Sequence, residues 1–245
     1  MPRTIVVSDI HGYYYTFVSL LAKVNYSQSK ADRLIMLGDY VDGGKNSLQV
    51  IDLVQLLVSS HESIAIGGNH DGMFINWLDG KDYPLLPYTA SRNGGQHTIR
   101  SFCPWYTGES DDDKARAIIL EQYISQINFL RNLPDFFEDN DHAYVHAGVN
   151  PELSDWRLTS HRDFRWLRSK FYAQDGLIPV DKKIIFGHEV CARLHGFSSF
   201  SPWFGNQIIG IDGGVKFGYQ LNALIIDDAM RYSTESVKID PRDLA

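Results

Sequence analysis

The segment TIVVSDIHG, residues 4–12, sets a pattern that the rest of the chain repeats. Its first four residues include three β-branched apolar side chains, and a polar cluster follows them directly. Short apolar runs without alternation are typical of strands that are buried on both faces of a sheet. The polar residues then stand at the carboxyl end of a strand, where open α/β sheets hold their functional sites.

Four more apolar runs end in polar clusters in the same way. They are LIML (34–37) before Gly38-Asp39, SIAI (63–66) before Asn69-His70, AYV (143–145) before His146, and KIIF (183–186) before Gly187-His188. Apolar residues recur at helical spacing between the first three runs, in residues 17–24 and 48–58. This alternation of strands and helices predicts an α/β fold with a layered core.

Two regions depart from that pattern. Residues 72–132 contain prolines, an Asn-Gly-Gly turn and, after the acidic run at 111–113, one long helical pattern that reaches residue 130. We expect this segment to form a helical cap beside the site, inserted into a single domain that spans residues 1–245. Beyond residue 207, IIGIDGG and YQLNALIIDD predict two strands joined by a glycine-containing turn.

The composition is that of an ordinary globular protein, with 44% apolar and 22% charged residues. The chain has 23 basic and 30 acidic residues and a formal charge of −7, so it lacks the basic surface by which proteins bind nucleic acid or anionic membranes. No apolar run approaches the ~20 residues that span a bilayer. The isolated cysteines Cys103 and Cys191 indicate buried thiols in a cytoplasmic protein, without a disulfide framework or a structural zinc site.

The polar clusters contain the side chains that bind metal ions. Asp9 and His11 are two residues apart, so in extended backbone both side chains point the same way and can face one ion. The later clusters add further donors of the same kinds: Asp39, Asn69, His70, His146 and His188. Hard oxygens mixed with imidazoles suit manganese, iron or zinc. Two such ions about 3.5–4 Å apart form the clamp that is used for displacement at phosphorus.

The other histidines lie outside this pattern. They fall in loops, polar helices or turns, where an isolated histidine is usually a surface residue. We therefore expect the following to be at the surface: His61, His97, His142, His161 and His195. His97 comes soon after the glycine-rich turn of the cap and is the one that could still approach the site.

Together these segments resemble the successive motifs of the calcineurin-like metallophosphoesterases. The motifs are DIHG (9–12), GDYVD (38–42), GNHD (68–71), HAG (146–148) and GH (187–188). The resemblance runs from about residue 4 to residue 226. It is closest to the phosphoprotein phosphatase branch, which includes bacterial Ser/Thr phosphatases and diadenosine tetraphosphate hydrolases. Nuclease-like members carry Gly-His-x-His at the last motif, whereas this chain has GHEV, with one histidine.

The resemblance implies a β-sandwich flanked by helices and a site with two divalent ions, manganese first and iron or zinc as alternatives. One ion would be held by Asp9, His11 and a bridging Asp39, and the other by Asp39, Asn69, His146 and His188. A water shared by two cations loses its proton near neutral pH, so a metal-bridging hydroxide would attack the phosphate. By the same resemblance, His70 would be the general acid, oriented by Asp42, and Arg168 would hold phosphate oxygens.

One position departs from the family's usual Gly-Asp-x-Val-Asp-Arg-Gly. Here Gly43 stands where a phosphate-binding Arg is expected. Glycine has no side-chain donor, so phosphate would bind more weakly by the ~1.5–3 kcal/mol of one charge-assisted hydrogen bond. Alternatively, Lys45, two residues further on, replaces the missing charge.

The sequence therefore predicts a metal-dependent phosphatase that hydrolyses phosphomonoesters, with Ser/Thr phosphoproteins as the first substrate class. A diadenosine tetraphosphate hydrolase is the alternative. Adenine would need an aromatic shelf, and the cap offers candidates that more often serve as core: Trp77, Tyr83, Tyr88, Trp105 and Tyr106. A more distant alternative is a catalytically inactive phosphate-binding scaffold, which the missing Arg suggests and the complete ligand set opposes.

Overall fold

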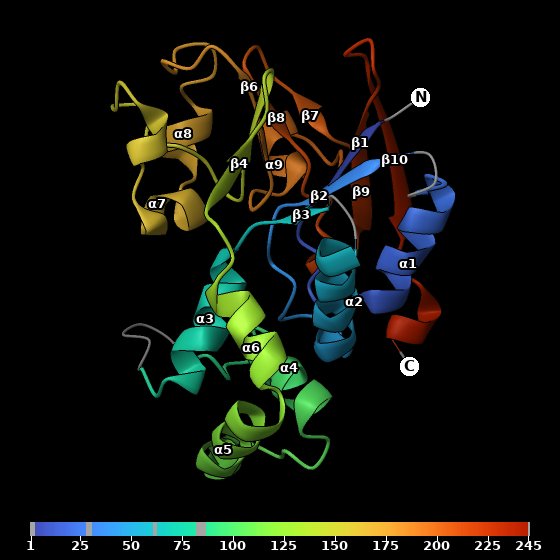
Figure 1. The fold of residues 1–245 in the computed structure, drawn as a ribbon, viewed down its shortest axis with the longest axis vertical. Coiled ribbons are helices and arrows are strands. Elements are labelled where there is room, and N and C mark those ends of the chain that lie inside the picture. The colour runs from blue at the N-terminus through green and yellow to red at the C-terminus, as the bar shows by residue number, and fades with distance from the viewer. Residues whose placement is uncertain (1–2, 28–30, 61–62, 82–86, 245) are drawn as a thin grey trace.

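The computed structural model describes residues 3–27, 31–60, 63–81 and 87–244. Two five-stranded sheets pack face to face, and helices cover their outer faces (Figure 1). The first sheet has the order β10-β9-β1-β2-β3, with β1 (Thr4–Val7), β2 (Arg33–Met36), β3 (Ile64–Ala65), β9 (Gln220–Ile226) and β10 (Tyr232–Lys238). The second has the order β4-β5-β6-β8-β7, with β4 (Phe136–Glu138), β5 (His142–Val145), β6 (Lys183–Phe186), β7 (Trp203–Phe204) and β8 (Ile208–Gly210). The predicted sandwich flanked by helices is confirmed.

Each sheet has a parallel centre. In the first sheet β1 pairs with β2 and β2 with β3, all parallel, and in the second β5, β6 and β8 are parallel. Parallel strands end at the same edge of a sheet. The polar clusters that follow β1, β2, β3, β5 and β6 are therefore brought to one end of the sandwich.

The central strands of the sandwich are buried on both faces, as their apolar sequences predict. In β1, Val6 points between the sheets, whereas Ile5 and Val7 pack under the helices. Helices α1 (Tyr14–Lys23) and α2 (Ser47–Ser60) lie on the first sheet, and α7 (His161–Trp166) and α8 (Ser169–Tyr172) lie beside the second. Each fully buried aliphatic side chain contributes roughly 1.5–3 kcal/mol, so these layers hold the strand ends firmly in place.

Four helices gather at one end of the molecule, below the sheets in Figure 1. They are α3 (Asn69–Leu78), α4 (Gly95–Phe102), α5 (Asp112–Gln122) and α6 (Ile124–Arg131). The expectation of one long helix here was wrong, because the backbone breaks at Tyr123, with φ −120° and ψ 32°. The Tyr123 ring packs edge-on against Phe102 at 5.0 Å, and the break lets Ile119 and Ile127 both enter the core.

The C-terminal part crosses between the sheets. The two expected strands form as β8 and β9, but they belong to different sheets. The chain between them contains the 3-10 turn η4 (Val215–Phe217). Strand β10, which pairs with β9, was not predicted, because its half-exposed sequence shows no apolar run.

The remaining elements are short. They are α9 (Cys191–His195) and the 3-10 turns η2 (Glu109–Asp111), η3 (Trp156–Leu158) and η5 (Pro241–Asp243). Cys103 and Cys191 are buried free thiols, as expected. Within the described residues, none of the helices has the length and apolar character that crossing a membrane requires.

Candidate active site

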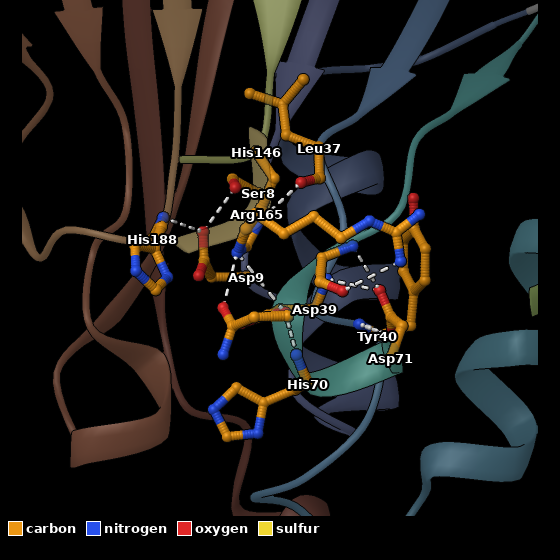
Figure 2. Close-up of polar contacts among 12 residues, drawn as sticks. Ser8, Asp9, Leu37, Asp39, Tyr40, His70, Asp71, His146, Arg165 and His188 are labelled. Atoms are coloured by element: carbon orange, nitrogen blue, oxygen red, sulfur yellow. Dashed lines mark hydrogen bonds and ion pairs between the residues drawn. The ribbon is translucent and has the colours of Figure 1, made fainter. Parts of the chain in front are cut away.

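The polar residues that follow the strands converge at the carboxyl edge of the sandwich (Figure 2). Two groups have ligand atoms that lie within 4.8 Å of one another, and Asp39 belongs to both. The first is His11, Asp39 and His70, and the second is Asp39, His146 and His188. The structure thus brings together side chains that are up to 179 positions apart in the sequence, as in the contact of Asp9 with His188.

Asp39 lies between two histidines that come from different sheets. Its Oδ2 is 3.6 Å from Nε2 of His11, and its Oδ1 is 3.5 Å from Nε2 of His146. Asp9 approaches the same His11 nitrogen, with Oδ1 at 3.8 Å. Each oxygen of the Asp39 carboxylate thus faces the Nε2 atom of a different histidine. This is the geometry of a ligand that bridges two metal ions.

Hydrogen bonds fix the ring orientation of both histidines. Nδ1 of His11 lies 2.8 Å from the Val41 carbonyl oxygen, and Nδ1 of His146 lies 2.7 Å from that of Leu37. Each carbonyl accepts the Nδ1 proton, so in the neutral ring Nε2 presents a lone pair to the site. That is the arrangement of a histidine prepared to bind a metal ion.

Two further features of the site are those expected where cations bind. Nε2 of His146 is 2.9 Å from Oδ1 of Asn69, which brings two acceptor atoms together when the ring is neutral. Nε2 of His188 is buried and, among the described residues, has no hydrogen-bond partner. A buried polar atom without a partner costs free energy. Bound cations would give a partner to Nε2 of His146, Oδ1 of Asn69 and Nε2 of His188.

The electrostatics favour a cation as well. Burial raises the pKa of Asp39 well above its usual range, and the nearby carboxylates of Asp9 and Asp71 raise it further. Burial also lowers the pKa of His11 and His188 well below the usual range, so these rings stay neutral. Crowded carboxylates beside neutral imidazoles are what a divalent ion stabilises.

The backbone at the site is strained. Of the eight non-glycine residues with positive φ in the described part of the chain, five belong to the predicted site: Asp9, His11, Asp39, Asp42 and His188. Such conformations cost of order 1–3 kcal/mol each and cluster at functional sites. Asp71 supports this backbone by accepting bonds from the amides of Asp39, Tyr40 and Gly68 at 2.8–2.9 Å.

Close packing explains the glycine before His188. A side chain at Gly187 would collide with the hydroxyl of Ser8 and the carboxylate of Asp9. Those two groups are hydrogen bonded, and Oδ2 of Asp9 also accepts from the His188 amide at 3.0 Å. Only glycine lets the loop after β6 approach β1 this closely, and the approach joins the two sheets at the site.

His70 and Asp42 form a second polar unit beside the ligand groups. Nδ1 of His70 is 2.7 Å from Oδ2 of Asp42, whose other oxygen accepts from the hydroxyls of Tyr88 and Thr98. Asp42 is fully buried, which raises its pKa to about 7. His70 also falls within the first ligand group, but Asp42 occupies its Nδ1, and Lys216 lies 2.9 Å from its Nε2.

Comparisons with known proteins agree with this geometry. The family model described as calcineurin-like phosphoesterase matches residues 2–217. The chain belongs to this family. It is 35% identical to serine/threonine-protein phosphatase 2 of Salmonella typhimurium over 216 residues, which cover 85% of this chain and 86% of that protein. It is 25% identical to the asymmetrical bis(5'-nucleosyl)-tetraphosphatase PrpE of Anoxybacillus flavithermus over 245 residues, with 89% and 88% covered.

Solved structures show the same fold. The metallophosphoesterase from Sphaerobacter thermophilus superposes with a TM-score of 0.59 at 18% identity, and the match covers 98% of this chain and 90% of that one. Family and fold together make this chain a metal-dependent phosphoric ester hydrolase. The identity of the metal is a separate question.

The three candidate phosphate-binding cations differ in their contacts. Arg168 pairs through Nη1 with the buried Glu189 at 3.0 Å, and about half of its side chain is exposed. Lys45 donates to the Leu244 carbonyl at 3.1 Å, so its described contact is with the C-terminal end of the chain. Lys216, which sequence reasoning missed, contacts His70, with its Nζ 2.9 Å from Nε2 of the ring. The only signal for it was a lysine within the glycine-rich turn IDGGVKFG (211–218).

The expectation of a surface position was wrong for His142 and is confirmed for His97 and His161, which are exposed. His142 is 2% exposed, because its ring packs under Tyr232 and Nε2 lies 2.7 Å from the Tyr232 hydroxyl. It lies at the amino end of β5 and lines a cavity of about 610 Å³, and none of the ligand residues lines that cavity. His97 is 2.5 Å from the Gly43 carbonyl oxygen through Nδ1. His61 and Tyr83 lie outside the described residues.

Three of the cap aromatics are core residues. Trp77, Tyr88 and Tyr106 are 2–4% exposed, and Trp77 and Tyr88 pack together around Phe74. Trp105 is 39% exposed. Packing therefore uses most of the aromatic surface that an adenine shelf would need.

Proposed function

We propose that this phosphoesterase hydrolyses phosphomonoesters of serine and threonine in proteins. The contact of His70 with Asp42, beside two groups of metal ligands, is the observation that carries this proposal. A serine or threonine alkoxide is a poor leaving group and needs a proton as it departs. A histidine held by a carboxylate is suited to supply that proton near neutral pH.

The residues divide the work as follows. Asp9, His11 and Asp39 would hold one ion, and Asp39, Asn69, His146 and His188 the other. Two divalent ions, manganese in our proposal, supply an activated water and offset the phosphate charge when bound. Asp42 keeps the His70 ring oriented, and the proton moves from Nε2 of His70 to the leaving oxygen. Arg168, steadied by Glu189, binds phosphate oxygens.

The location of the protein is part of the proposal. Two buried free thiols and no disulfide among the described residues support a reducing compartment, the cytoplasm. The net charge of −7 supports substrates that are neither nucleic acid nor a membrane surface.

A diadenosine tetraphosphate hydrolase is the second candidate, and the similarity to PrpE over 89% of the chain favours it. The two substrates differ in what leaves. A nucleotide departs as a phosphate anion that is stable without a proton, whereas a serine alkoxide is not. The His70–Asp42 pair is needed for the serine ester and dispensable for the dinucleotide, which is why we rank the phosphoprotein first.

A direct comparison of substrates tests the proposal. We would load the protein with manganese, determine bound metal by elemental analysis, and measure kcat/KM for a phosphoserine peptide, p-nitrophenyl phosphate and diadenosine tetraphosphate. We expect two ions per chain and the highest kcat/KM for the peptide. A higher value for the dinucleotide would select the second candidate. Metal binding without turnover of any ester would identify a phosphate-binding scaffold instead.

A further inference from the structure

Lys216 approaches His70 from the segment that crosses between the two sheets. It lies on η4, which follows β8, and its Nζ is 2.9 Å from Nε2 of His70 and 3.0 Å from the Asn93 carbonyl oxygen. Within the described ranges Lys216 has no carboxylate partner at ion-pair distance, whereas Arg168 has Glu189 at 3.0 Å. Lys216 is thus a half-buried cation that is held only by neutral acceptors.

The surroundings of this ammonium are those of an anion-binding group. Asp9, Asp39 and Asp42 attract it from a distance, and these carboxylates are the ones that bound ions or the His70 ring would engage. An ammonium that donates to a neutral imidazole and a neutral carbonyl exchanges these bonds readily for bonds to a doubly charged phosphate, because an ionised acceptor adds Coulomb attraction to the hydrogen bond.

We infer that Lys216 is a phosphate-binding residue of this site and supplies the positive charge that Gly43 cannot. This inference rests on the proposed function. In the substrate-free protein the ammonium donates to His70. When substrate enters, the flexible four-carbon stem lets Nζ move to a non-bridging phosphate oxygen. Nε2 of His70, which accepted the bond from the ammonium and so carried no proton, is then free to take up a proton from solvent and to face the leaving oxygen.

Lys45 is the competing candidate for this role. Its ammonium donates to the Leu244 carbonyl, 199 positions away in the sequence and next to η5. Lys216 instead contacts the residue that we propose as the acid, and it approaches with its charge directed at the reacting group. The distance to His70 therefore favours Lys216.

The test measures phosphate binding separately from turnover. Isothermal titration calorimetry of the manganese-loaded protein gives the Kd for inorganic phosphate, and steady-state kinetics on the phosphoserine peptide gives KM and kcat. Lys216→Met should raise both Kd and KM by about 10- to 100-fold, the effect of one charge-assisted hydrogen bond, with unchanged manganese content. Lys216→Arg should keep most of the affinity because it keeps the charge.

Lys183→Met is the matched control. Lys183 also donates to a backbone carbonyl, that of Asn206 at 2.9 Å, but at the amino end of β6. Its loss should leave phosphate binding unchanged. If Lys216→Met does not fold, Lys216→Gln, which can still bond to the Asn93 carbonyl, should show the same loss of affinity.

Three results would overturn the inference. An unchanged phosphate Kd in Lys216→Met or Lys216→Gln, with a wild-type protein that binds phosphate and hydrolyses the peptide, would refute the role of Lys216 alone. Loss of manganese in these variants would show a structural role instead. A manganese-loaded wild type that binds no phosphate and cleaves no ester would refute the proposed function together with this inference.

Discussion

The two sheets contribute different charges to the same site. The loops of the first sheet carry the carboxylates that face the ligand histidines and His70, namely Asp9, Asp39 and Asp42. The segments of the second sheet carry the cation Arg168, which is paired with Glu189, together with the ligands His146 and His188, and the crossing from β8 to the first sheet carries Lys216. A substrate phosphate in this site would therefore meet metal carboxylates on one side and side-chain cations on the other.

The contrast between the sheets shows where the missing charge can come from. In the family's usual motif an Arg follows directly after the second Asp, so the anion and the cation lie on one loop. In this chain that loop ends in Gly43-Gly44, and a cation comes from a turn more than 170 positions later in the sequence. Charge at a site is set by convergence in space, so a gap in one motif does not decide whether phosphate can bind.

Removing a ligand from the second sheet should have the largest effect. His188→Ala removes a buried imidazole that we assign as a metal ligand. Among the described residues its Nε2 has no hydrogen-bond partner. We expect manganese affinity to fall by more than about 100-fold at one site, since loss of an outer hydrogen-bond partner alone costs 10–100-fold. Elemental analysis after dialysis measures the bound metal.

His195→Ala is the control for this change. His195 is a histidine of the same segment, on α9, and it contacts the Ser201 carbonyl at 3.1 Å. It should retain two ions per chain. If His188→Ala also retains two ions at wild-type affinity, the second sheet does not contribute the ligand that we assign to it.

Removing the proposed acid, His70, should have the second-largest effect. His70→Asn removes the proton donor and should lower kcat for a phosphoserine peptide by about 10²–10⁴-fold with metal content unchanged. For p-nitrophenyl phosphate the loss should be smaller, because nitrophenolate leaves without a proton. Steady-state kinetics on both esters measures the difference, and equal losses on both would contradict the role of an acid.

Placing the family's Arg at Gly43 should not increase the affinity for phosphate. Gly43 has φ 150°, and a Cβ there would lie 2.9 Å from the His11 carbonyl oxygen and 3.1 Å from the His11 Cβ. Gly43→Arg should therefore lower the free energy of unfolding by about 1–3 kcal/mol and give no gain in phosphate affinity. Urea denaturation and calorimetry measure the two quantities.

Gly108→Arg is the matched control, because Gly108 has extended backbone, with φ 168°, and open space around its Cα. It should unfold like the wild type. A Gly43→Arg protein that is as stable as wild type and binds phosphate more tightly would show that the loop can accept the family's Arg after all.

The first half of the site could be predicted because its signals are local. Asp9 and His11 follow an apolar run directly, although the expected extended backbone was wrong: β1 ends at Val7 and both residues have positive φ, because the chain turns sharply there. Asp39, His146 and His188 likewise each lie within a few residues of a strand. These residues converge wherever parallel strands share an edge, so the sequence was sufficient to predict that they meet.

The features that the sequence did not predict depend on contacts between segments that are distant in the chain. Lys216 reaches His70 because β8 lies beside β6 and the chain then crosses to the first sheet, and no periodicity in residues 211–218 indicates that path. The break at Tyr123 and the burial of His142 also follow from partners distant in sequence, Phe102 and Tyr232. Tertiary contacts decide such features.

The smallest effect is expected for Lys45, the cation closest in sequence to the missing Arg. Its described contact is with the Leu244 carbonyl, beside η5 and Asp243, which itself holds the start of α1 through Thr16. Lys45→Ala should leave KM and kcat for the phosphoserine peptide within about twofold of wild type, as expected for a surface substitution. A rise in KM of tenfold or more would return the phosphate-binding charge to the first sheet. It would also remove the contrast between the sheets, because cation and anion would then share one loop as in the family's usual motif.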